Sequence, residues 1–303
     1  MKIPNLTLSI ILSAVSAQSS AQVSGRVYPE RNDDLAWENE LVAFRAYGPE
    51  TQRRGEKSYG YDIFLKYPDK GEVLERLYGA QCSRQNWEKV DSLKKIDPVE
   101  AKEFEQTFTY HVDHGYGMDC FAVGPTLGCG VAAITLGDSI CYPWCYDKVE
   151  ILENGPDRFV AALTFAPVRI GKDENVTEHR KITLCRNSHL NHCEVSFTGL
   201  SSPQKIVFGF PIRLKDTEYI DTASGILAVV DPTQGDENGK VFLGLKSHRT
   251  DCSAVVIDNH ILMSSVIKPD ETLVYDWGFA WDRTDINTFE QWIEYLTTLK
   301  TYE

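Results

Sequence analysis

Residues 225–245 read GILAVVDPTQGDENGKVFLGL, two apolar runs joined by a polar turn, and this arrangement decides the fold class. The runs Gly225–Val230 and Val241–Leu245 favour strands, whereas Thr233–Gly239 contains residues that favour turns. Similar strand-like runs recur along the chain, at Leu41–Tyr47, Tyr61–Tyr67, Phe159–Phe165, Ile182–Leu184, Ile206–Phe210, Ala254–Ile257 and Thr272–Trp281. No repeat or long linker interrupts them. The sequence therefore predicts one all-β domain over residues 22–303, a large antiparallel β-sandwich.

A few short helices complete the expected architecture. Asp97 and Pro98 are suited to a helix start, and the pattern that follows predicts a helix to about Gln106. A second helix is expected over 284–299, because its apolar residues recur on one face. A further short helix is expected near 83–95.

The N-terminus indicates where the protein works. Lys2 precedes an apolar run at 6–15, and small residues follow it, as in a cleaved signal peptide. The run is too short to span a bilayer comfortably. Because the cleavage region contains no cysteine, we do not expect a lipid anchor there. We therefore expect residues 1–21 to be a signal peptide and the mature protein to be periplasmic or secreted, without membrane insertion.

The net charge and the cysteines restrict the function classes further. Loss of Lys2 with the signal peptide shifts the formal charge from −13 to −14, which disfavours nucleic acid and anionic membranes as partners. Eight cysteines are acceptable in an oxidising compartment. Cys185 and Cys193 flank a short segment, so a hairpin-closing disulfide is one expectation and buried free thiols are the other.

The segment 110–130, YHVDHGYGMDCFAVGPTLGCG, is the densest cluster of reactive side chains. Histidine titrates near neutral pH, so His111 and His114 are candidate acid–base residues, with Tyr110 and Tyr116 beside them. Two histidines alone are too few ligands for a metal site, and we expect neither a metal nor another cofactor. A glycine-rich loop that the histidines merely structure is the alternative.

Other candidate residues lie on predicted strands. Arg45 shares a strand face with Tyr47, and Asp62 shares one with Lys66; each set is suited either to binding a sugar carboxylate or to a structural ion pair. The remaining candidate substrate-binding residues are Trp37, Asp119, Trp144 and His179.

Several motifs, taken in order, resemble the bacterial domain of unknown function 4861. They read WENELVAFRAYGP, SYGYDIFLKYP, YHVDHGYGMDCFAVGPTLGCG, ENGPDRFVAALTF and WGFAWDR followed by FEQWIEYL. The resemblance implies a secreted protein of polysaccharide-utilisation loci, with a β-supersandwich similar to galactose mutarotase and to some polysaccharide lyases. It also implies an association with dehydration of uronic-acid oligosaccharides. The chain departs from the family in its many cysteines, including Cys129 within the glycine-rich motif.

Together these features predict a carbohydrate-active enzyme that performs β-elimination, as a dehydratase or lyase, on a uronate-containing oligosaccharide. His111 or His114 is the expected base and Tyr110 or Tyr116 the expected acid. Arg45 and Lys66 would bind the carboxylate, while Asp62 and Asp119 would orient the histidines or bind hydroxyl groups. The alternatives are a sugar epimerase or mutarotase, and a glycan-binding protein without catalysis.

Overall fold

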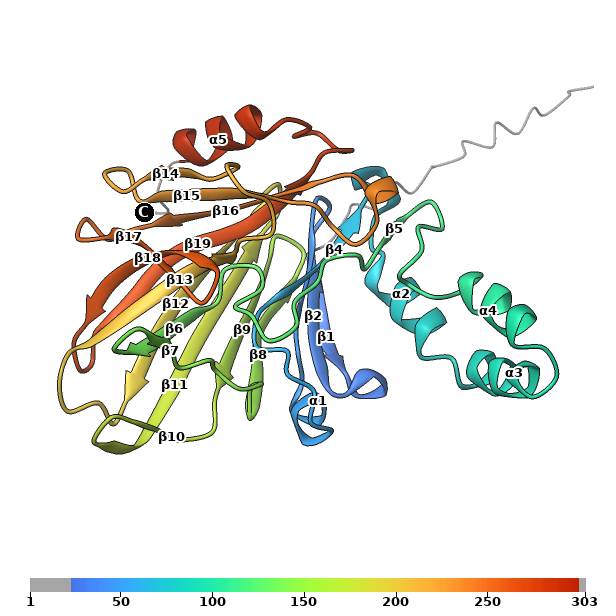
Figure 1. Cartoon of the computed structure of the whole chain (residues 1–303), viewed down its shortest axis with the longest axis horizontal. Coiled ribbons are helices and arrows are strands. Elements are labelled where there is room, and N and C mark those ends of the chain that lie inside the picture. The colour runs from blue at the N-terminus through green and yellow to red at the C-terminus, as the bar shows by residue number, and fades with distance from the viewer. Residues whose placement is uncertain (1–22, 300–303) are drawn as a thin grey trace, which may run out of the picture.

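The computed structural model describes residues 23–299, and all of the strands in this range belong to three antiparallel sheets (Figure 1). The largest sheet has the order β14 (Tyr219–Asp221), β15 (Ile226–Asp231), β16 (Val241–Ser247), β19 (Thr272–Trp281), β12 (Leu190–Thr198), β11 (Asp173–Cys185), β9 (Arg158–Thr164) and β8 (Lys148–Gly155), with β10 (Val168–Ile170) paired to β11. The second sheet is formed by β17 (Ser253–Ile257), β18 (His260–Ile267), β13 (Gln204–Pro211), β6 (Ala132–Leu136) and β7 (Ser139–Ile140). The N-terminal sheet is formed by β1 (Ser24–Tyr28), β2 (Asp34–Glu38), β3 (Ala43–Ala46), β4 (Asp62–Lys66) and β5 (Gly117–Met118).

The two smaller sheets contribute to the core with the inner face of the largest one. Alternation along β19 places Tyr275 and Trp277 on this face. The ring of Trp277 stacks on Tyr61, with centroids 4.2 Å apart, and meets Phe44 of β3 edge-on. On the other side, Tyr275 contacts Phe208 of β13. One cluster of buried side chains therefore includes residues of all three sheets, and the predicted antiparallel β-sandwich is confirmed.

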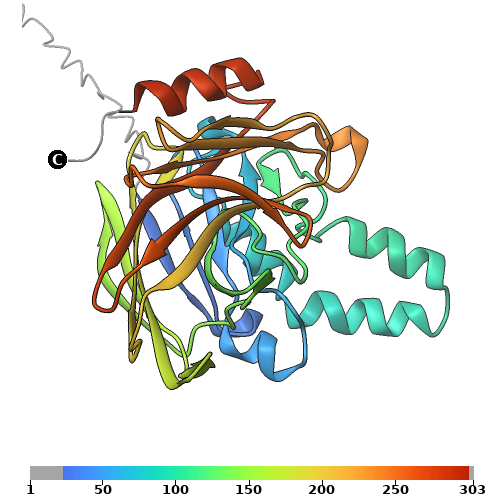
Figure 2. The ribbon, with the colours of Figure 1, turned by 60° about the vertical axis from the view of Figure 1, so that its left-hand side comes forward.

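The helices lie outside the sheets. α5 (Phe289–Thr298) covers the outer face of the largest sheet, while α2 (Leu74–Gln81) packs against the N-terminal sheet. α3 (Arg84–Lys94) and α4 (Pro98–Gln106) form a hairpin that projects from the body of the protein (Figure 2). α1 (Pro49–Arg53) and the 3-10 turns Pro29–Arg31, Pro68–Lys70 and Asp236–Asn238 lie in connections. Among residues 23–299, no helix is both long and apolar enough to cross a bilayer.

Side-chain caps explain why the predicted helices start where they do. The Asp97 carboxylate accepts hydrogen bonds from the first backbone amides of α4, with Pro98 in the first turn. Ser83 caps α3 and Thr288 caps α5 in the same way. The helix predicted over 284–299 therefore begins later, at Phe289, because residues 284–288 form bends and irregular chain that lead to the Thr288 cap.

The cysteines form no disulfide within residues 23–299. The register pairs Cys193 with Ile182, so Cys185 does not face Cys193 across the hairpin, and the disulfide prediction is wrong; all eight cysteines are free thiols. The predicted signal peptide lies outside the described residues.

Candidate active site

A cavity of about 390 Å³ opens beside the N-terminal sheet, where β3 and β4 meet the segment that leads into and out of β5. Arg45 of β3 and Asp62 of β4 line it together with Tyr110, His111 and Asp119 from residues 110–119. Its lining consists of Arg31, Arg45, Tyr47, Glu56, Lys57, Ser58, Asp62, Tyr110, His111, Asp119, Phe121, Ala122, Val123, Gly124 and Gln234. The cavity therefore joins polar residues from distant parts of the sequence.

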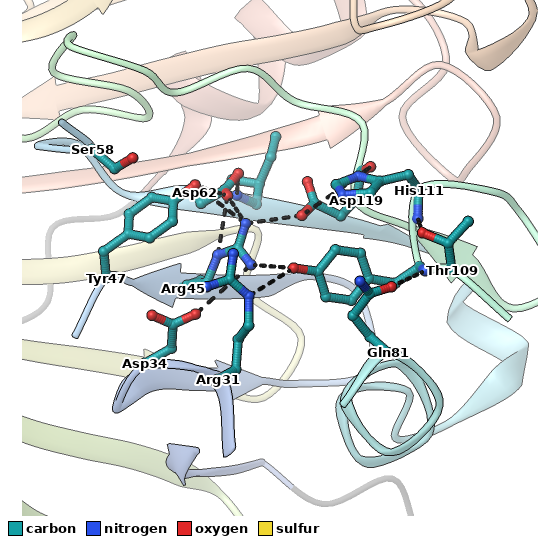
Figure 3. A network of polar contacts seen from close by, with 12 residues as sticks. Arg31, Asp34, Arg45, Tyr47, Ser58, Asp62, Gln81, Thr109, His111 and Asp119 are labelled. Carbon is teal, nitrogen blue, oxygen red and sulfur yellow. Dashed lines mark hydrogen bonds and ion pairs between the residues drawn. The ribbon is translucent and has the colours of Figure 1, made fainter. Parts of the chain in front are cut away.

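Arg45 is the centre of the polar network shown in Figure 3. Its Nε donates to Oδ2 of Asp62 at 3.1 Å, its Nη2 donates to Oδ2 of Asp119 at 2.9 Å, and a second contact joins Nη2 to Asp62. Nη1 lies 3.8 Å from Oδ2 of Asp34. Tyr47 accepts a hydrogen bond from Nη2 at 3.2 Å and donates one to Asp62 at 2.6 Å. The positive charge of Arg45 is thus already neutralised by protein carboxylates.

Burial raises the pKa of two of these carboxyl groups. Burial, together with the nearby charge of Asp62, raises the pKa of Asp119 to about 6. Burial likewise raises the pKa of Asp34 to about 6, although Arg45 opposes the shift. Two carboxyl groups of the network can therefore gain or lose a proton near pH 6.

Tyr110 places its hydroxyl group between two guanidinium groups. The hydroxyl oxygen accepts from Nε of Arg31 and from Nη1 of Arg45, each at 3.2 Å. Its backbone amide donates to Gln81 of α2, and its carbonyl accepts from the amide of Asp119, so the residue is fixed at both ends. Burial raises the pKa of Tyr110. The neutral hydroxyl therefore retains a proton that it can donate to a bound molecule.

His111 lies at the mouth of the same cavity with 56% of its side chain exposed. Its Nδ1 lies 2.9 Å from the backbone carbonyl oxygen of Asp119. Because a carbonyl oxygen only accepts hydrogen bonds, Nδ1 carries the proton, and Nε2 has a free lone pair in the neutral ring. The ring lies edge-on to Tyr110, with centroids 4.7 Å apart. A potential base and a potential acid are therefore adjacent in one cavity.

Arg31 and Lys57 are the cationic groups of the cavity that remain available for a ligand. Arg31 ends the turn Pro29–Arg31 and uses Nε for Tyr110, whereas its two terminal amino groups have no hydrogen bond within residues 23–299. Lys57 is exposed at the rim and forms no ion pair in the same described range. An anionic group that enters the cavity would meet these two side chains first.

The structure brings together half of the residues that the sequence proposed for the site. Those that line the cavity are Arg45, Tyr47, Asp62, Tyr110, His111 and Asp119. The expectation that Arg45 binds a substrate carboxylate needs correction, because its partners are Asp62 and Asp119. Trp144 lies outside this cavity, 46% exposed, and lines two neighbouring pockets.

Five residues that the sequence predicted in the site lie outside this cavity. Lys66 shares the face of β4 that carries Asp62 but lies at the other end of the strand, where its fully buried ammonium donates to Glu38 at 2.5 Å and to the carbonyl oxygen of Asn39. Trp37 belongs to the core and donates to Asn191.

The other three lie at the surface or near it. Nε2 of His114 bonds to the carbonyl oxygen of Thr109, the Tyr116 ring packs under Arg76, and His179 contacts Thr198 on the outer face of β11.

Sequence reasoning missed Arg31, Asp34, Lys57 and Ser58. Arg31 and Asp34 flank a turn in which Asn32 and Asp33 both have left-handed backbone angles, with φ of 57° and 61°. The run Arg31 to Asp34 is a polar turn directly before a strand, and that signal could have identified it. Nothing in the sequence around Lys57 or Ser58 points to a site.

The chain matches one protein family and can be aligned with a curated protein and with a solved structure. The family model described as "Domain of unknown function (DUF4861)" matches residues 10–302. "Uncharacterized protein P7" of Formosa agariphila is 26% identical over 298 residues, which cover 93% of this chain and 68% of the relative. A solved structure, "Putative kojibiose phosphorylase from human microbiome", aligns at 9% identity with a TM-score of 0.35, covering 57% of this chain and 29% of that one. The family description and the relative's name state no activity.

Proposed function

Because the chain belongs to the DUF4861 family, as its ordered motifs predicted, and that description names no activity, we propose a function from its own residues. The protein is a carbohydrate-active enzyme that performs β-elimination on an oligosaccharide containing a uronic acid. The observation that carries this proposal is the pairing of His111, with Nε2 free to accept a proton, and Tyr110, with a hydroxyl proton free to leave.

The first half of the reaction is removal of the proton α to the carboxylate. Nε2 of His111 takes this proton, and the electron pair of the C–H bond moves into the carboxylate to give an enolate. The hydrogen bond from Nδ1 to the Asp119 carbonyl holds the ring in the tautomer required of a base and remains intact when the ring becomes positively charged.

The second half is departure of the oxygen on the β carbon. The enolate electrons form the carbon–carbon double bond as the C–O bond breaks, and Tyr110 protonates the leaving oxygen. The two guanidinium donors on the Tyr110 oxygen, from Arg31 and Arg45, stabilise the phenolate that results. Return of the proton from His111 to Tyr110, through solvent, restores both groups.

The cationic groups of the cavity favour an acidic sugar. A protein with a formal charge of −13 repels an anionic substrate at long range, so binding requires local positive groups. The terminal amino groups of Arg31 and the ammonium of Lys57 supply them, and Arg31 can bind a carboxylate through two parallel hydrogen bonds. Since Arg31 also contacts Tyr110, a carboxylate bound there lies close to the acid.

The neighbouring pockets favour an oligosaccharide over a single sugar. Tyr47 and Ser58 line both the main cavity and a second pocket, and Trp144 lines that pocket and a third, more apolar one. An exposed tryptophan offers a flat apolar surface on which a sugar ring can stack. This series of adjoining pockets supports binding of more than one sugar unit, with Trp144 outside the cavity that contains His111.

Elimination creates a conjugated double bond, so ultraviolet absorbance tests the proposal directly. The protein is incubated with a panel of uronate-containing oligosaccharides, and products are analysed by mass spectrometry. We expect absorbance to rise with wild type and with His179→Ala, and to fall at least ~100-fold in rate with His111→Ala. Folded protein that produces no absorbance change across the panel would refute elimination. Unchanged mass with altered anomeric NMR signals would instead identify an epimerase or mutarotase.

The proposed compartment is the periplasm or the extracellular space. The predicted signal peptide supports this location. Detection of the mature N-terminus near residue 22 in the periplasmic or culture fraction would test it.

A further inference from the structure

The outer face of the largest sheet carries a second cluster of histidine and carboxylate side chains, formed by His192, His248 and Asp276. None of the three lines the candidate active site. The three residues are distant from one another in the chain. We refer to them as the His–Asp–His cluster.

Strand register explains how the cluster forms. His192 of β12 is directly opposite Asp276 of β19, and their neighbours Cys193 and Tyr275 face the core, so His192 and Asp276 both face outward. His248 follows the last residue of β16, and its backbone amide donates to the carbonyl of Val274. Antiparallel pairing of β12, β19 and β16 thus places the three side chains together.

Both imidazoles approach one carboxylate. Nδ1 of His192 lies 2.7 Å from Oδ1 of Asp276, and Nε2 of His248 lies 2.8 Å from Oδ2. The three ligand atoms lie within 4.8 Å of one another, and the two rings are nearly perpendicular, at 82°. We propose that the His–Asp–His cluster binds one divalent transition-metal ion, with zinc as the natural probe.

The donor set and its spacing fit such an ion. Two imidazole nitrogens and a carboxylate oxygen are a common ligand set for zinc and related metals, with a water as the fourth ligand. Ligand atoms around tetrahedral zinc are about 3.4 Å apart, so the present contacts need to open by well under 1 Å. The side chains of His192 and His248 are 22% and 18% exposed, which leaves a path for the ion and a water.

The surroundings hold the ligands in place. The Asp276 side chain is 4% exposed, which limits its motion. Lys246 is opposite Asp276 in the register, but its ammonium donates to the carbonyl of Leu299 at 2.8 Å instead of pairing with Asp276. Arg249 forms ion pairs with Asp251 and Glu271, and these fix the loop that carries His248. An ion here would tie this loop to β12 and β19.

Calorimetric titration of Zn²⁺ into the chelator-treated full-length protein tests the site. We expect one equivalent to bind wild type, and each of His192→Ala, His248→Ala and Asp276→Asn to weaken binding at least ~10-fold. His179→Ala, a histidine on the outer face of β11, is the matched control and should bind zinc as wild type does. Zinc should also raise the thermal midpoint of wild type and of this control, but not that of the three variants.

Other outcomes would overturn the proposal. The variants keep all eight cysteines, so binding that is equal in wild type and variants would assign zinc to the thiols or to adventitious sites. Absence of binding to folded wild type would exclude the site outright. His248→Gln keeps a polar side chain in the loop, so it carries the comparison if Asp276→Asn does not fold.

Discussion

Replacement of Arg45 by methionine tests whether the buried network holds the candidate site together. The Arg45 side chain is 3% exposed and pairs with Asp62 and Asp119, whose side chains are 1% and 3% exposed. Methionine keeps most of the apolar stem but leaves these carboxyl groups without their cation. Loss of one partner of a buried ion pair costs about 3–5 kcal/mol. We expect a loss of this size in the free energy of unfolding near neutral pH.

The loss should depend on pH, and the sign follows from the acidity of Asp119. Its pKa in the folded wild type is about 6, already raised above 3.8, and Arg45 is one of the groups that lower it. Without Arg45, the pKa of Asp119 rises further, so the folded variant keeps a proton that the unfolded chain has released. A group with a raised pKa in the folded state loses stability as pH increases, by about 1.4 kcal/mol per unit and proton. Between pH 6 and pH 8 the variant should therefore lose up to about 2 kcal/mol more than wild type, in which Asp119 is already half ionised at pH 6.

Urea unfolding at pH 6 and at pH 8, followed by circular dichroism, measures both effects. Lys181→Met breaks an exposed ion pair with Glu194 and serves as the control, with an expected change within about 0.5 kcal/mol at either pH. If Arg45→Met destabilises the protein equally at the two pH values, the carboxyl groups do not retain protons, and the account of the network is wrong. A loss below about 1 kcal/mol would refute the burial argument itself.

Three further predictions concern single side chains. Gly117→Ala should destabilise the protein by more than ~2 kcal/mol, because a Cβ would lie 2.1 Å from the Leu65 carbonyl oxygen. Gly124→Ala is the control: its Cβ would meet open space, so it should cost only ~1 kcal/mol of backbone strain. Thermal unfolding compares the two variants, and similar losses of stability would contradict the predicted clash. In wild type, Asp119 loses its stabilising contribution as pH rises from about 4 to 6, because its pKa is about 6 in the folded protein and lower in the unfolded chain. Asp119→Asn should therefore make the free energy of unfolding fall less steeply as pH rises over this range, and an unchanged slope in unfolding experiments would assign the fall to other groups. Trp144→Ala should raise KM for longer oligosaccharides more than for short ones and leave the melting temperature nearly unchanged, since the ring is 46% exposed; equal effects on all lengths would exclude stacking there.

Local patterns predicted most of the fold. The run Thr272–Trp281 is β19 with the predicted bounds, and Asp97 caps the helix that its sequence predicted, because strand alternation and helix capping depend on neighbouring residues. The expected disulfide failed for a different reason. Pairing of Cys185 with Cys193 depends on the register of two strands, and the spacing of the cysteines does not specify that register.

The candidate site likewise depends partly on local sequence and partly on contacts between distant segments. The sequence by itself identified residues 110–119 as the segment that carries the proposed acid–base groups, since the density of histidine and tyrosine is a property of one short segment. Only the tertiary structure decided that Tyr110 and His111 face the cavity whereas His114 and Tyr116 do not, and that Arg31, not Lys66, is the cation within reach. Which face of a strand a charged side chain occupies, and whether a buried carboxylate already neutralises it, depends on contacts between segments far apart in the chain. The residue types that could perform the chemistry are therefore visible in the sequence, whereas their proximity in one cavity depends on the tertiary structure.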